Sequence, residues 1–384
     1  MFTSLPRLLG HASAADGSLW PASVCIAVAA LAFCAAGCSL RPTNVQREGG
    51  RVWIDDVPRG KGEGNGYIRG LETLLAHAGT PTSYERLMGL SGLAFITQAD
   101  TEHRWQGKLD AGWWPLDPWG LELRREFLAR ATGHEIANVG WPSMEPAVKD
   151  TKPPEFYRTH IHAHVKRSIE AGRPVVGIWC DFGFVITGYD GAADRPPVWG
   201  RCARSSTSRQ DRCSDWPAGL FMLGRRIEPM DRDAADAAAV RHAVALAHDQ
   251  AGPTDPRWRH RRFTGQKAYA AWAALLRNVD EPTEDMHHAN VKRRLLDNRR
   301  AAVAYLRSVA ERREGQAAEE LHRATASYGE VLKLAGQIKP KGLSGNPEAR
   351  RNLADLVDRI AAAELEAAKH LERAATHMAA GTTH

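Results

Sequence analysis

Short apolar runs bounded by glycine, proline or aspartate indicate a sheet-forming region in the middle of the chain. Runs of this length with such borders are typical of buried strands, and we expect three of them to be neighbours in an antiparallel sheet. They read RPVVGIWC, FGFVITGYD and GLFMLGRRI, at residues 173–180, 182–190 and 219–227. A helix is predicted over 157–170, because Gly172 and Pro174 follow it in the order that ends a helix.

The pattern changes after residue 230, where apolar residues recur every three or four positions. This spacing gathers apolar side chains on one face of a helix. It predicts helices over 233–249, 265–277, 287–312, 314–338 and 347–378. We interpret them as an antiparallel helical bundle. The predicted fold class is therefore α+β, with an α+β domain over 51–230 and a helical domain over 231–380.

The first forty residues carry a separate signal. VCIAVAALAFCAAG, at 24–37, has the length and the small-residue end of a signal peptide, and it is short for a membrane span. The last residues of this region, Ala35-Ala36-Gly37-Cys38, resemble a bacterial lipobox, in which a peptidase cuts before a lipid-modified cysteine. The resemblance implies a signal peptide over 1–37, a linker over 38–50, and a lipoprotein anchored through Cys38 to a cell-envelope membrane, facing the periplasm or the exterior. A plain secretory signal or a membrane anchor is the alternative.

Export would leave three cysteines in the folded protein. Cys202 and Cys213 flank a polar loop, and in an oxidising compartment they form the most economical disulfide. Closing so short a loop would contribute about 2.5–3 kcal/mol. Cys180 is then the odd thiol.

The charge distribution argues against a nucleic-acid partner. Lysine and arginine number 51, aspartate and glutamate 45, and they are well mixed, for a net charge of +6. Such a balance predicts a mildly basic surface and not a concentrated basic patch. We interpret the densest basic run, RWRHRR at 257–262, as a solvated or membrane-facing linker.

Two local motifs suggest a phosphate site and a zinc site but lack the required spacing. The glycine-rich stretch at 60–70 leads into a predicted helix, yet its glycines are spaced G-x-G-x-x-x-G and not as in the dinucleotide fingerprint. THIHAH would place only His160 and His164 on one helix face, which is too few ligands for zinc. We expect no cofactor and no metal.

Residues 66–98 combine a helix, a glycine turn, a second helix that starts at S-Y-E-R-L, and the stretch MGLSGLAF. Together with AGRPVVGIW and FGFVITGYD, this stretch resembles the N-terminal domain of the butirosin biosynthesis protein H family and its papain-like relatives. These relatives share the ground plan of the bacteriocin-processing cysteine peptidases. The resemblance implies a papain-like domain over 51–230, with a thiol at the start of the first helix and a histidine on the facing strand.

Both catalytic positions hold other residues. A papain-like thiolate is stabilised by the dipole of the helix that it starts, and a histidine shares its proton. The helix here starts at Asn65 or Gly66, and the histidine position falls at residues 181–183, which contain no histidine. We therefore expect a degenerate papain-like domain that has lost the ancestral chemistry.

We expect a binding cleft between this helix and the strand that ends at Asp190. Its predicted lining is Asn65, Gly66, Trp113, Trp114, Phe182, Tyr189 and Asp190. The two tryptophans belong to an aromatic loop over 103–127 that suits a sugar, a peptide or an aryl ligand, or that forms a small core of its own. The predicted function is noncatalytic binding of a peptide, a glycan or a small polar ligand.

Two other functions stay open. Cys180 would be the nucleophile of a thiol-dependent amide hydrolase or acyltransferase, although no spacing argument places a base beside it, and an inert strand-end cysteine is the bland alternative. A structural envelope protein that acts through the helical domain is the third possibility.

Overall fold

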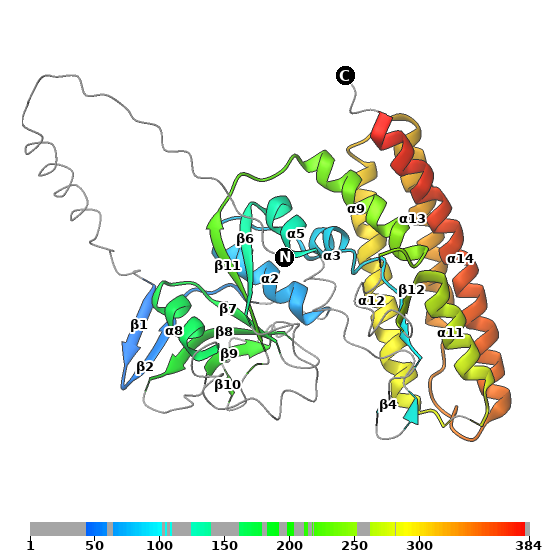
Figure 1. Ribbon diagram of the computed structural model, residues 1–384, viewed down its shortest axis with the longest axis horizontal. Helices are drawn as coiled ribbons and strands as arrows, with labels where there is room; N and C mark the ends of the chain where they lie inside the picture. The colour runs from blue at the N-terminus through cyan, green and yellow to red at the C-terminus, as the bar shows by residue number, and fades with distance from the viewer. Residues whose placement is uncertain are drawn as a thin grey trace, which may run out of the picture. The chain divides into compact units, whose positions relative to one another are not determined.

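The computed structural model describes most of the chain from residue 44 to residue 380, and Asn44–His384 belongs to one compact unit (Figure 1). The described part excludes residues 60–63, 102–103, 106–107, 110–123, 140–160, 179–182, 192–197, 203–210, 214–216, 218, 252–261 and 281. The predicted signal peptide and Cys38 lie outside it.

An eight-stranded antiparallel sheet forms the first half of the described chain. Its main path runs β1-β2-β8-β7-β11-β6, while β9 pairs with β8 and β10 pairs with β9. The strands are β1 (Val45–Glu48), β2 (Arg51–Ile54), β6 (His134–Val139), β7 (Val175–Ile178), β8 (Gly183–Asp190), β9 (Val198–Cys202), β10 (Asp211–Cys213) and β11 (Gly219–Arg226). The three strands expected from the sequence are neighbours, since β7 pairs with both β8 and β11.

Helices cover the sheet and explain why β7 is apolar throughout and why β8 is buried up to its last residue. Strands buried on both faces read as continuous apolar runs and do not alternate. All four residues of β7 are buried, and α2 (Gly66–His77) packs against β7, β8 and β11, while α8 (Ala163–Glu170) packs against β2, β7 and β8. A Cβ atom on Gly70 would lie 2.6 Å from Val176, so this glycine lets α2 approach the sheet closely.

Two more helices accompany this layer. α3 (Tyr84–Ser91) begins at the cap Ser83 and ends at Gly92, whose φ of 82° is favourable only for glycine. α5 (Arg125–Thr132) precedes β6 and packs against it. Two small sheets, β3 (Gln98–Asp100) with β12 (Arg262–Thr264) and β4 (Arg104–Trp105) with β5 (Lys108–Leu109), complete the strands.

The second half is helical, as the sequence predicts. The helices agree with the predicted ranges to within two residues: α9 (Arg232–Ala247), α11 (Gly265–Arg277), α12 (Asp285–Ala310), α13 (Gly315–Gly336) and α14 (Pro347–Ala380). α14 packs against α9, α11 and α13, and α12 packs against α13 and α3. Within the described part of the chain, no helix has the length and apolar character needed to cross a membrane.

The buried core continues across the predicted boundary at residues 230 and 231, which falls between β11 and α9. Phe95, just after α3, contacts Tyr305 of α12 and Tyr328 of α13, with ring centroids 6.2 and 5.9 Å apart. The α+β fold is thus present, and its sheet and its C-terminal helices share one set of apolar contacts.

Candidate functional site

Asn65 lies at the start of α2, where the family resemblance implies a thiol. Its side-chain Oδ1 accepts hydrogen bonds from the backbone N–H groups of Tyr67 (3.0 Å) and Ile68 (3.2 Å). This is an N-cap, which satisfies donors that the first helical turn leaves without a partner. The amide side chain is therefore engaged in its own helix.

The backbone of Asn65 is held by a tyrosine from α3. The N–H of Asn65 donates to the hydroxyl of Tyr84 (2.7 Å), which in turn donates to Oδ2 of Asp297 on α12 (2.7 Å). Burial and the Asp297 carboxylate raise the pKa of Tyr84 well above its ordinary value of 10. The phenol consequently stays protonated, and it links the start of α2 to α12.

The start of β8 lies directly against the start of α2. A Cβ atom on Gly183 would be 2.4 Å from the carbonyl oxygen of Gly66, a distance that real Cβ atoms essentially never show. The two glycines thus permit backbone-to-backbone contact. No side chain fits between the helix start and the strand start at this point.

Tyr189 and Asp190 lie at the opposite end of β8. Seven residue-to-residue steps along the extended strand lead from Gly183 to Asp190, a distance of about 23 Å. The Tyr189 hydroxyl donates to Oε1 of Glu170 on α8 (2.8 Å), and Asp190 Oδ1 accepts from Nε1 of Trp199 on β9 (2.6 Å). These side chains fasten α8 and β9 to β8, and the structure does not bring them together with Asn65 and Gly66.

Several predicted site residues lie outside the described residues, namely Trp113, Trp114, Phe182 and Cys180. Cys180 belongs to the four-residue connection between Ile178 of β7 and Gly183 of β8, which pair with each other. The predicted disulfide is not favoured by the strand register, because Cys213 pairs with Val198, at the other end of β9 from Cys202. A Cys202–Cys213 bond stays a prediction that requires a different register.

A hollow of about 250 Å³ lies beside α2. Its walls come from Pro58 and Arg59, from one face of α2, and from residues 81–83 before α3. The polar groups in these walls are the side chains of Arg59, Glu72, Thr73, Thr82 and Ser83. One positively charged side chain, one negatively charged side chain and several hydroxyl groups therefore line a space large enough for a small polar molecule.

Glu72 is the notable residue of this hollow, and the sequence analysis missed it. The residue is 8% exposed, and its carboxylate pairs with Arg69 at 2.8 Å. Arg69 also places its guanidinium carbon 3.8 Å from the ring centroid of Tyr84. Glu72 interrupts the apolar stripe of α2 formed by Ile68, Leu71 and Leu75, and a carboxylate on such a stripe is a signal that could have identified it.

In the part of the chain that the structure covers, no three histidine, cysteine, aspartate or glutamate side chains are arranged to hold a metal ion. Of the histidines in THIHAH, His164 lies near the guanidinium of Arg167, and burial lowers the pKa of His162.

Comparison with known proteins adds no relative. No protein-family model matches the chain, and no curated protein matches its sequence.

Proposed function

We propose that this protein is a cell-envelope lipoprotein that binds a small polar ligand without catalysing a reaction. The α+β part is, in this proposal, a papain-like domain that has lost its thiol chemistry. One observation carries the proposal: Asn65 caps α2, and Gly66 contacts the backbone of Gly183, at the place where the family arrangement implies a thiol opposite a histidine. Among the described residues at this helix start, Asn65 and Gly66 offer no thiol, which supports a binding role over thiol catalysis.

The hollow beside α2 is the proposed ligand site. Arg59 is exposed, whereas the Glu72 carboxylate is buried and held by Arg69, so a cation and a positioned anion line one space. This combination favours a small ligand that carries both charges, such as an amino acid or the end of a short peptide, over a neutral sugar.

A thermal-stability screen tests the ligand class. A ligand that binds only the folded protein raises its melting temperature. We expect free amino acids or dipeptides to raise it, and monosaccharides to leave it unchanged. Glu72→Gln should abolish the rise, whereas Glu85→Gln, a change on α3 outside the hollow, should preserve it. An unchanged rise in Glu72→Gln, or no rise with any compound, contradicts the proposed site.

The lipid anchor is tested separately, through the residue that would carry it. Cys38→Ser is expected to release the protein from the membrane fraction or to block its maturation, because the acyl chains supply the membrane affinity. Fractionation of cells that express either form measures the effect. Unchanged membrane retention of the variant would count against the anchor.

A further inference from the structure

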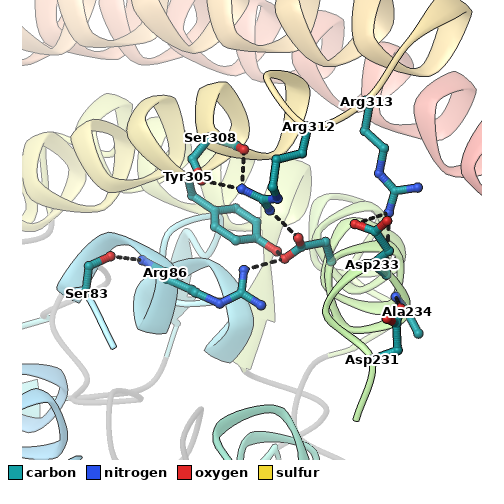
Figure 2. A network of polar contacts seen from close by, with 10 residues as sticks. Ser83, Arg86, Asp231, Asp233, Ala234, Tyr305, Ser308, Arg312 and Arg313 are labelled. Carbon is teal, nitrogen blue, oxygen red and sulfur yellow. Dashed lines mark hydrogen bonds and ion pairs between the residues drawn. The ribbon is translucent and has the colours of Figure 1, made fainter. Parts of the chain in front are cut away.

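On α9, a buried carboxylate accepts a hydrogen bond from an arginine of α3 and pairs with an arginine that follows α12 (Figure 2). Asp236 is fully buried and accepts hydrogen bonds from Arg86 of α3 (2.9 Å) and from the Tyr305 hydroxyl of α12 (2.9 Å). Its other oxygen pairs with Arg312, which follows α12. One carboxylate thus faces two guanidinium groups, and positive charge is in excess.

Arg124, at the start of α5, adds a further cation. This arginine is only 8% exposed, and its guanidinium carbon lies 3.9 Å from the ring centroid of Phe127. No carboxylate in that part pairs with it, and burial lowers its pKa to about 10. Buried arginines are ordinarily paired with an acid, so Arg124 has a charge that nothing described neutralises.

Arg124 belongs to the same electrostatic environment as the Asp236 cluster. The charges of both Arg86 and Arg124 act on the Tyr305 hydroxyl. His242 of α9 is held neutral, since burial and the charge of Arg124 lower its pKa to about 3. Asp233, the nearest other acid of α9, is already paired with Arg313 at 3.1 Å.

The backbone around Arg124 also favours an anion. α5 begins here without a side chain that caps it, and a helix start attracts negative charge. His242 is close to the end of α3, because a Cβ atom on Gly92 would lie 2.6 Å from its ring. α3 packs against both α5 and α9, so Arg86, Arg124 and His242 come from neighbouring helices, in a region where the described residues hold more cations than acids.

We propose that this region binds the phosphate group of a small molecule, with Arg124 as its principal ligand and His242 as a second donor. A guanidinium presents two parallel N–H groups that match two phosphate oxygens. The doubly charged group suits the excess of arginines over acids better than a single carboxylate does. Because Arg124 is nearly buried, only a small ligand reaches it.

Thermal unfolding of the mature chain at constant ionic strength tests the proposal. We expect the melting temperature to rise with the concentration of inorganic phosphate or glycerol 3-phosphate, and far less with acetate. The two phosphate arms distinguish a free ion from a monoester. Arg124→Gln should weaken the apparent affinity about tenfold or more, whereas Arg130→Gln, an exposed arginine of the same helix, should retain it.

The His242 ring gives a second readout that needs no variant. A bound phosphate stabilises the imidazolium, so the pKa of His242 measured by NMR should rise when phosphate is added. A melting temperature and a His242 resonance that both ignore phosphate would overturn the proposal. So would an Arg124→Gln protein that responds to phosphate as the unmodified protein does.

Discussion

At the scale of the single residue, Asn65 decides how the start of α2 is understood. A thiol at this position would be a nucleophile. The side-chain oxygen of Asn65 instead accepts hydrogen bonds from two backbone N–H groups, and the backbone N–H of Asn65 donates to the Tyr84 hydroxyl. The side-chain oxygen and the backbone N–H of Asn65 therefore both stabilise the folded structure. The glycines on either side, Gly64 and Gly66, fit the same role: a Cβ atom on Gly64 would lie 2.8 Å from Tyr84.

Removing the cap should therefore lower the stability of the fold. Asn65→Ala deletes the acceptor of two helix-start donors and is expected to lower the free energy of unfolding by about 1 kcal/mol. Asn65→Ser keeps an acceptor and should stay close to the unmodified protein. Urea unfolding followed by circular dichroism measures both, and an Asn65→Ala protein as stable as the original would show that the cap is unimportant.

At the scale of the element, the Asp236 cluster joins α3, α9 and α12. Its members come from residues 86, 236, 305 and 312, and each bond crosses between elements that are distant in sequence. A buried ion pair is a weak source of net stability, yet losing one partner leaves the other charges uncompensated. The cluster therefore determines the relative orientation of these helices more than it adds to the net stability of the fold.

Breaking this cluster should be far more costly than breaking a surface pair on the same helix. Asp236→Asn leaves Arg86 and Arg312 without their carboxylate, and we expect a loss of about 3 kcal/mol. Asp233→Asn removes a half-exposed partner of Arg313 and should cost less than about 1 kcal/mol. Equal unfolding midpoints in urea for the two variants would contradict the role given to Asp236.

The elements that the sequence predicted are those with a strong local period or a continuous apolar run. The C-terminal helices are long enough for the three- and four-residue spacing to be unambiguous. The sequence did not predict the β1–β2 hairpin. Its first strand, β1, lies inside the predicted linker over 38–50, and β2 begins directly after that linker. Its signal is Gly49-Gly50, where φ values of 55° and 83° build the tight turn that such pairs favour.

The site could be predicted only in part, because its contacts join distant residues. The helix start at Asn65 and Gly66 follows from the sequence, since a capping residue precedes an apolar period. The bond from Tyr84 to Asp297 spans 213 residues, and no local pattern reveals it. The predicted grouping of Asn65 with Tyr189 and Asp190 assumed that one strand end lines the cleft, whereas the strand is long enough to keep them apart.

At the scale of the whole molecule, the helical half is more than an appendage. Phe95 packs between Tyr305 and Tyr328, and Arg299 on α12 donates to the carbonyl oxygen of Ala94 (2.8 Å). Arg299 is fully buried and pairs with Glu364 of α14. The C-terminal helices thus hold the loop after α3 in place. A ligand that binds beside α2 and α3 would therefore stabilise elements that contact both halves of the protein.

The central claim is that the protein binds without thiol catalysis, and the reactivity of Cys180 tests it most directly. An activated thiolate alkylates rapidly at neutral pH because its pKa is lowered. We measure the rate of alkylation by iodoacetamide at pH 7 and compare it with that of an ordinary free thiol. The account predicts a rate no faster than the free thiol. A much faster rate, together with an amide-hydrolase or acyltransferase activity that Cys180→Ser abolishes, would contradict it.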